Sequence, residues 1–347
     1  MKVTVLAEPW EIPPRYYGGA ERMCHLLCDG LVSQGHQVNL LSAKASVGYN
    51  GKTLGHKLPS SNLCDRALKR VSFAAKSLRL AWQADVIYTY RFWPEYFTVV
   101  NHLKIPLIYC QQNTSKADDL QRVLRCNPNY GFMQGVSNDQ ILSLKEAPSN
   151  ERLFMIYNAV NTNVVSPVAR PASSYLAYLG RLNYDKGVDL AVEISRRTGV
   201  PLKIAGVIRP HEPEARILFE EKVRPFLGDQ IEFIGPIDDS QKSDFLGNAL
   251  ALLMPNRWRE PFGITMAESL ASGTPVIGTS VGSIPEVIDD MKTGFVCHSF
   301  EQMCDSVRQV HLIRRKDCRD SALSRFSHGV YLRAVIDMFN DCRGYVS

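Results

Sequence analysis

The stretch that indicates the fold most clearly is LALLMPNRWREPFGITMAESLASGTPVIGT, residues 250–279. A short apolar run leads into a polar loop, a helical pattern, a glycine and a second apolar run. This order predicts a strand, a helix that begins near residues 262–263, and a second strand. Strand–helix–strand is the repeating unit of doubly wound α/β sheets.

Similar apolar runs alternate with helical patterns along the whole chain of 347 residues, among them KVTVLA, QVNLLS, YLAYLG and LKIAG. Most are apolar on both faces, which is typical of strands in a parallel sheet covered by helices. We therefore predict an α/β protein with two Rossmann-like, doubly wound domains that face each other across a cleft. We expect the site in that cleft, at the carboxyl ends of the strands.

The domain boundary is expected in a stretch rich in Pro and Ser at residues 161–174. This gives an N-terminal domain of residues 1–165 and a C-terminal domain of residues 166–347. The last helix, about residues 326–343, is one that could cross back to the N-terminal domain.

Composition excludes some classes of protein. The net charge is only +5, from 40 basic and 35 acidic residues, which argues against a nucleic-acid binder. Nine dispersed cysteines without a CxxC pair indicate reduced thiols rather than a disulfide framework. No apolar segment is long enough for a signal peptide or a membrane span. We expect a cytoplasmic protein, with peripheral attachment to the inner face of a membrane as an option.

That option rests on residues 65–82, DRALKRVSFAAKSLRLAW, which have the pattern of a basic amphipathic helix. Its predicted apolar side is Leu68, Val71, Ala75 and Leu78, and its charges are Lys69, Arg70, Lys76 and Arg79. The interpretations stay open: the helix packs on its sheet with solvated charges, or it contacts an anionic membrane or a polyanionic lipid-linked acceptor.

Two carboxylates frame the predicted helix start in the opening stretch. Glu260 precedes the helix, and Glu268 lies within its first two turns. The backbone N–H groups between them have no partner inside the helix and favour an anion. Two acids on either side of such donors suit a ligand with hydroxyl-rich ends and a phosphate between them.

Other predicted loops add cations and glycines. GRLNYDKG places Arg181 and Lys186 between a strand and a helix, which suits a diphosphate. Gly18 and Gly19 open another predicted helix, where backbone N–H groups could approach a ligand. Exposed loop charges and a plain helix entry are the alternatives.

Taken together, the chain resembles a family 4 glycosyltransferase with the GT-B fold. The resemblance covers nearly the whole chain and rests on GGAER (18–22), GHQV (35–38), YNAVNTNVVSP (157–167), GRLNYDKG (180–187), EPFGITMAESLASGTPVIGT (260–279) and GSIPEVIDDMKTGFV (282–296). It implies a retaining enzyme that takes a sugar from a nucleotide sugar and needs no metal. A UDP-sugar is the favoured donor and a GDP-sugar the alternative.

The resemblance also implies roles for matching residues. Arg181 and Lys186 would bind the donor diphosphate, and Glu260 would bind hydroxyls of the donor sugar; these three are the predicted catalytic residues. The other predicted donor-binding residues are Gly18, Gly19, Phe262, Gly263, Ile264 and Glu268, with Glu268 on the nucleotide ribose.

The acceptor side is less defined. Where many family members have a histidine, this chain has Gln112, with Gln111 as the alternative, and glutamine cannot act as a general base. Trp10 and Tyr17 are predicted acceptor contacts because aromatic faces suit sugars. The acceptor would be a hydroxyl of a glycan, a glycolipid or a small molecule.

Metal independence is expected because the pairs Asp118–Asp119, Asp238–Asp239 and Asp289–Asp290 form no DxD motif at a clear strand end. We favour front-face substitution, in which the leaving phosphate takes the acceptor proton. A sugar-nucleotide epimerase on the same fold and a non-catalytic nucleotide-sugar-binding module are the alternatives.

Overall fold

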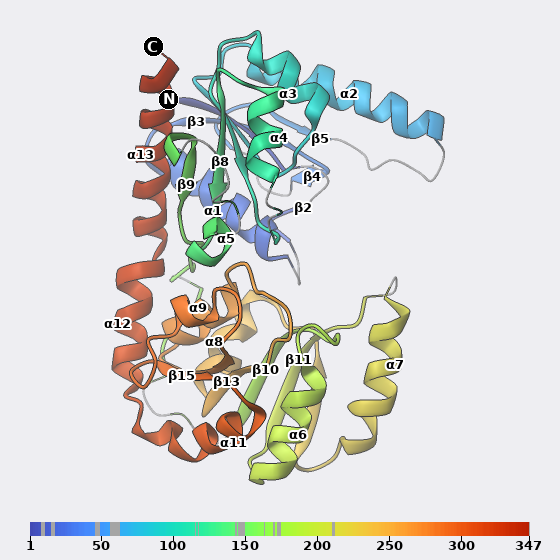
Figure 1. Ribbon diagram of the computed structural model, residues 1–347, viewed down its shortest axis with the longest axis vertical. Helices are drawn as coiled ribbons and strands as arrows, with labels where there is room; N and C mark the ends of the chain where they lie inside the picture. The colour runs from blue at the N-terminus through green and yellow to red at the C-terminus, as the bar shows by residue number, and fades with distance from the viewer. Residues whose placement is uncertain are drawn as a thin grey trace. The chain divides into compact units, whose positions relative to one another are not determined.

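The computed structural model describes most of the chain (Figure 1). The described residues are 1–7, 11–14, 18–45, 49–55, 63–114, 116, 118–142, 144, 150–162, 164–168, 171, 175–209 and 212–346.

The described chain forms two compact units. The first comprises Met1–Pro14, Gly18–Tyr157 and Tyr331–Ser347, and the second contains Asn158–Val330. The chain passes from the first unit to the second after Tyr157, and its last residues, from Tyr331 onward, belong to the first unit. Among the described helices, none is both long enough and apolar enough to cross a membrane.

The first unit is built on a seven-stranded sheet with the order β5-β3-β1-β6-β7-β8-β9, and every pairing is parallel. The strands are β1 (Lys2–Leu6), β3 (Gln37–Ser42), β5 (Thr53–Gly55), β6 (Val86–Thr89), β7 (Leu107–Cys110), β8 (Gly131–Gly135) and β9 (Leu153–Met155), and β2 (Glu11–Ile12) pairs separately with β4 (Lys44–Ala45). The helices are α1 (Gly19–Ser33), α2 (Leu63–Ala81), α3 (Pro94–Asn101), α4 (Asp119–Cys126) and α5 (Asn138–Leu142), with a 3-10 turn at Asn150–Arg152.

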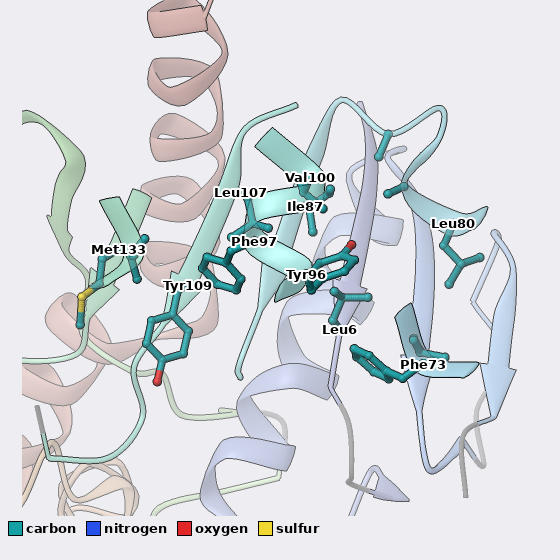
Figure 2. Close-up of a cluster of buried hydrophobic side chains, with 14 of the residues drawn as sticks. Leu6, Phe73, Leu80, Ile87, Tyr96, Phe97, Val100, Leu107, Tyr109 and Met133 are labelled. Atoms are coloured by element: carbon teal, nitrogen blue, oxygen red, sulfur yellow. The ribbon is translucent and has the colours of Figure 1, made fainter. Parts of the chain in front are cut away.

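One hydrophobic cluster of the first unit lies between the sheet and helices α2, α3 and α4. Figure 2 shows Leu6, Ile87 and Leu107 of the sheet facing side chains of α2 and α3. Phe97 of α3 packs edge-on against Tyr109 of β7, with ring centroids 6.3 Å apart. Successive side chains of a strand point to opposite faces, and Val3, Val5 and Leu6 of β1 are all buried, so both faces of the sheet are covered and the strands show no polar alternation.

The second unit is built on a six-stranded parallel sheet with the order β12-β11-β10-β13-β14-β15. Its strands are β10 (Leu176–Arg181), β11 (Leu202–Val207), β12 (Ile231–Gly235), β13 (Ala251–Met254), β14 (Val276–Thr279) and β15 (Gly294–Cys297). Its helices are α6 (Val188–Thr198), α7 (Pro213–Lys222), α8 (Asp239–Gly247), α9 (Ile264–Ala271), α10 (Ile284–Val287), α11 (Phe300–Gln309) and α12 (Arg315–Phe326), with 3-10 turns at Arg224–Phe226 and Val310–Leu312. The predicted pair of Rossmann-like α/β domains is confirmed.

The last helix, α13 (His328–Val346), begins in the second unit and continues into the first. Within the first unit, Phe339 of α13 packs edge-on against Tyr88 of β6, with centroids 5.7 Å apart. Arg152 donates to the Tyr345 hydroxyl at 2.9 Å and lies over its ring. These contacts attach the end of the helix to the first sheet.

Helix α2 corrects one expectation from the sequence. Its buried side carries Phe73, Ser77 and Leu80, whereas Val71 of the predicted apolar side is 68% exposed. Ala75 is also exposed. Both sides of the helix carry apolar residues, and the fit of Phe73 and Leu80 into the core decides which side faces the sheet.

Candidate functional site

The predicted site residues of the second unit gather at the carboxyl ends of its strands. Arg181 is the last residue of β10, and the loop of residues 255–263 connects β13 with α9. Strands β10 and β13 are paired neighbours in a parallel sheet, so both loops leave the sheet at the same edge. Ligands of open α/β sheets bind at this edge.

Helix α9 begins as the sequence predicts. Gly263 is its N-cap residue, with φ at 76°, a left-handed conformation that strains residues with a Cβ. A Cβ at residue 263 would also lie only 2.5 Å from the Met266 side chain, so a larger residue would clash there. Glu260 precedes the cap and Glu268 lies in the second turn.

Glu260 is the centre of a polar cluster and only 7% exposed. Its Oε2 accepts hydrogen bonds from the Lys186 ammonium, from Asn256 Nδ2 at 2.7 Å and from Trp258 Nε1 at 3.3 Å. A buried carboxylate needs such donors to offset its lost hydration. All three donors use Oε2, and the described residues provide no hydrogen bond to Oε1.

The indole ring of Trp258 brings the two predicted phosphate-binding cations together. Lys186 Nζ lies 4.9 Å from the ring centroid, and Arg181 Cζ lies 6.0 Å from it. Both distances are within the range of cation–π attraction. Arg181 and Lys186 are therefore held at one aromatic surface beside the Glu260 carboxylate.

Arg181 is incompletely satisfied. Its Nη1 lies 3.5 Å from Glu212 Oε1, a long ion-pair distance, and its buried Nε has no hydrogen-bond partner in the described part of the chain. Buried donors are normally paired with protein, water or ligand. The unused donor is therefore suited to an anionic ligand.

The loop that carries Lys186 is clamped to the loop that carries Trp258. Arg257 forms a bidentate ion pair with Asp189, with nitrogen–oxygen distances of 2.8 and 2.7 Å. The guanidinium also lies over the Tyr184 ring, 4.0 Å from its centroid. The hydrogen bonds that Arg257 donates to Asp189 raise the pKa of the guanidinium. These contacts of Arg257 fix the two loops relative to each other.

The backbone of Glu260 is fixed by the segment after β14. Ser283 donates its backbone N–H to Glu260 O at 2.9 Å. Gly282 approaches so closely that a Cβ there would lie 2.3 Å from Glu260 N, and its φ is 63°. Only glycine fits this approach without displacing Glu260.

Glu268 lies apart from this cluster in a second polar contact. Its Oε1 accepts a hydrogen bond from Lys242 of α8 at 2.5 Å, and both side chains are buried. Its Oε2 is buried and has no hydrogen-bond partner among the residues that the structure describes. Each of the two predicted glutamates thus has one oxygen held by a lysine.

The remaining predicted site residues belong to the first unit. Gly18 is the N-cap of α1, as the sequence predicts, and Gly19 is the first residue of the helix. Gln112 follows β7 and donates from Nε2 to Cys110 Sγ at 3.2 Å. Trp10 and Tyr17 lie outside the described residues.

The alternative residue Gln111 is more deeply held than Gln112. It is buried, accepts from the Tyr109 hydroxyl at 2.9 Å and donates to Asp119 Oδ2 at 3.1 Å. These bonds use both ends of its amide group. Gln112 is only partly buried, which favours it as the ligand contact of the two.

Sequence reasoning missed three contributors: Asn256, Trp258 and Lys242. Asn256 and Trp258 stand within a few residues of Glu260, so their proximity was available as a signal. Lys242 lies 26 positions before Glu268, and no local pattern links the two.

The sequence of the chain is similar to those of known glycosyltransferases. Residues 164–322 match the family described as glycosyl transferases group 1. An uncharacterized glycosyltransferase of Methanocaldococcus jannaschii is 24% identical over 337 residues, covering 83% of each chain.

Solved structures show the same fold. Sucrose-phosphate synthase from Thermosynechococcus elongatus aligns with a TM-score of 0.79 at 18% identity, covering 98% of each chain. Anabaena HepE, solved with UDP and glucose, aligns with a TM-score of 0.79 at 15% identity, covering 98% of this chain and 99% of HepE. The protein is therefore a glycosyltransferase enzyme with the GT-B fold, and its residues 164–322 are similar to the group 1 glycosyl transferases.

Proposed function

We propose that this enzyme transfers a sugar from a nucleoside-diphosphate sugar to a hydroxyl acceptor and retains the anomeric configuration, as family 4 glycosyltransferases do. The observation that carries the proposal is the cluster of Arg181, Lys186 and Glu260 around Trp258. It combines two cations for a diphosphate with a carboxylate for sugar hydroxyls.

The proposed donor contacts follow from the free positions of this cluster. The buried Nε of Arg181 and the Lys186 ammonium would bind the diphosphate. Glu260 would accept a sugar hydroxyl on Oε1, because Oε2 already serves three donors. The backbone of residues 262–264 would line the donor, and Glu268 would bind the ribose.

UDP is the favoured donor nucleotide and GDP the alternative. Support for UDP comes from Anabaena HepE, which shares the fold and was solved with UDP and glucose. Gly18 and Gly19 are proposed to contribute donor contacts from the first unit, and Gln112 is proposed to contact the acceptor together with Trp10 and Tyr17.

The proposed reaction is a front-face substitution. The bond from the anomeric carbon to the diphosphate oxygen breaks, and the acceptor oxygen bonds to the same carbon from the same side. The acceptor proton moves to the departing phosphate oxygen. A double displacement through Glu260 is less favoured, because donors on its Oε2 draw electron density from the carboxylate.

Charge stabilisation is the proposed source of catalysis. Negative charge develops on the departing diphosphate, beside Arg181 and Lys186, and the start of α9 adds a positive dipole end. Charges fixed in place before the reaction cost no reorganisation when the bond breaks.

We further propose that the transfer needs no metal. In the described part of the chain, no group of three or more His, Cys, Asp or Glu side chains is placed to hold one. Asp238 instead caps α8 through a hydrogen bond from Ser240 N at 2.9 Å. Dialysis against EDTA should leave turnover unchanged, and activity that returns only with added Mg²⁺ or Mn²⁺ would overturn this part.

The test of the whole proposal is a panel of nucleotide sugars, scored by release of free nucleoside diphosphate from wild type and Glu268→Ala. One donor should bind and release its diphosphate slowly, and the variant should lose both properties. An epimerase would instead interconvert two nucleotide sugars without release. A binding module would bind without turnover. The anomeric configuration of an acceptor product, read by NMR, then tests retention.

For the acceptor side we propose contact with an anionic membrane through the exposed side of α2. Val71 is 68% exposed and Trp82, just after the helix, is 73% exposed. Trp82 borders a hollow of about 420 Å³ that is also lined by Lys2, Lys52 and Arg79. Exposed apolar residues next to cations suit an anionic bilayer surface.

Vesicle co-sedimentation tests this contact. Binding should appear with phosphatidylglycerol vesicles at low salt, weaken as salt rises and be absent with phosphatidylcholine. Arg79→Glu should weaken it, while Arg314→Glu on the second unit should not. Absence of binding to anionic vesicles at low salt would refute the membrane contact. The acceptor would then be expected to be a soluble molecule.

A further inference from the structure

Lys242 and Glu268 form the most deeply buried ion pair at the candidate site. Their exposures are 6% and 5%, and Lys242 Nζ lies 2.5 Å from Glu268 Oε1. Asp239, on the outer side of α8, lies 3.2 Å from the same ammonium. The lysine therefore crosses from α8 to α9 and meets a carboxylate on each.

The geometry of α8 fixes where this lysine points. Asp238 and Gln241 form a capping box at the helix start, which places Lys242 one turn inside the helix. At the other end, Thr274 donates its hydroxyl to Leu246 O at 2.7 Å and ties α8 to the segment after α9. The capping box thus fixes the start of α8, and the Thr274 hydrogen bond ties its end to the segment after α9.

The second oxygen of Glu268 is the unusual feature. Oε2 is buried and accepts no hydrogen bond from any described residue, although Oε1 of the same group is held at 2.5 Å. A buried acceptor without a donor is costly and calls for a partner that is brought in from outside. The lysine therefore holds one oxygen and leaves the other for a ligand donor.

Stability alone gives a weak reason for such a pair. Buried ion pairs are often no better for stability than well-packed apolar residues of the same size. An ion pair at the ligand-binding edge of a sheet can instead serve recognition, because it orients one carboxylate oxygen toward a ligand. The position of Glu268 in the second turn of α9, at the carboxyl edge of the sheet, fits that use.

We propose that Lys242 is a positioning residue for nucleotide recognition: it holds Glu268 Oε1 so that Oε2 accepts a hydrogen bond from a ribose hydroxyl of the donor. This inference rests on the proposed nucleotide-sugar function and adds a residue to it. Lys242 itself touches no substrate in this scheme. The pair thereby selects ribonucleotide donors over their deoxy analogues.

The test measures binding of UDP and GDP, and of their 2′-deoxy and 3′-deoxy forms, by titration calorimetry. Wild type should bind a ribonucleotide roughly 10- to 100-fold more tightly than one deoxy form, the range for one hydrogen bond to a charged group. Lys242→Met should weaken binding of the ribonucleotide and leave binding of that deoxy form nearly unchanged. The ratio of the two affinities should therefore fall toward one. Lys242→Arg, which can still donate to Glu268, should restore part of the preference.

Two further variants distinguish a positioning role of Lys242 from a general loss of folding or stability. Glu268→Gln is nearly isosteric and should also remove the preference, which keeps the test valid if Lys242→Met folds poorly. Arg325→Met breaks another ion pair of the second unit, Arg325–Asp289 at 3.1 Å, and should retain the preference.

The outcomes distinguish the inference from the function on which it rests. Binding of neither nucleotide by wild type would overturn the proposed function and the inference with it. Tight nucleotide binding without a ribose preference would overturn the inference alone. Equal weakening of ribo and deoxy forms in Lys242→Met would assign the lysine a purely structural role and overturn it as well.

Discussion

Trp258 donates its indole N–H to Oε2 of Glu260 across 3.3 Å, two residues along the same loop. The same ring lies 4.9 Å from the Lys186 ammonium. Trp258 thus interacts with both an anion and a cation of the site. Its indole N–H binds the carboxylate, and the face of its ring attracts the ammonium group.

Trp258→Phe should lower turnover roughly tenfold. The phenyl ring still offers a face to Lys186, but the hydrogen bond to a charged acceptor is lost, which is typically about 1.5–3 kcal/mol. We take the lower end because 3.3 Å is long for an N–H···O bond. Release of nucleoside diphosphate under saturating donor is the measurement. Trp82→Phe, at an exposed position of the first unit, is the matched control, and equal rates in all three proteins would contradict the role.

Lys186→Ala should lower turnover by roughly 100-fold or more, because one lost contact to developing charge costs about 2.7–4 kcal/mol in the barrier. It also leaves Glu260 with one donor fewer. Lys203→Ala is the control, since Lys203 pairs with Glu232 at 3.3 Å on the surface. An unchanged rate in Lys186→Ala would remove this lysine from the active site.

Gly282→Ala should displace the Glu260 backbone and lower turnover at least tenfold. The new Cβ would lie 2.3 Å from Glu260 N, and a φ of 63° costs a residue with a Cβ roughly 1–2 kcal/mol. Far-ultraviolet circular dichroism should remain unchanged, because the effect is local. Gly228→Ala, with no heavy atom within 4 Å of its added Cβ, should behave as wild type. Full activity of Gly282→Ala would refute the close approach.

Alkaline pH should destabilise the protein in part through Cys110. Burial raises the pKa of this thiol to about 11, from an ordinary value of 9.0. Below about pH 9 the thiol is protonated in both states, and its contribution to stability is complete. As the pH rises from about 9 to about 11, only the unfolded chain loses the proton, so the free energy of unfolding falls, by roughly 3 kcal/mol at most.

Urea unfolding at about pH 8 and about pH 10.5 measures this effect in wild type and Cys110→Ala. The variant is expected to lose less stability between the two pH values, whatever its stability at pH 8. Identical losses in both proteins would show that this thiol does not contribute.

Much of the second unit could be predicted because its signals are local. The start of α9 follows from the loop, Gly263 and the apolar pattern after it, all within ten residues. Glu260 and Glu268 were identified through their spacing around that start. Arg181 and Lys186 were found in the same way, between a strand end and a helix.

Other contacts depend on segments that lie far apart in the sequence. Lys242 reaches Glu268 only because α8 and α9 pack against each other, and no spacing in the sequence signals it. Helix α2 gives a second example. Its sequence carries apolar residues on two sides, and periodicity alone placed Val71 rather than Phe73 on the buried side.

The sequence by itself determined the order of strands and helices, the parallel α/β class and the main charged residues of the candidate site, because helix and strand periods and helix ends are short-range properties of the chain. Only the tertiary structure decided which oxygen of each glutamate is held, which ring the two cations share and which side of α2 is buried. Those features arise from distances between segments that are close only after the sheets and helices have packed.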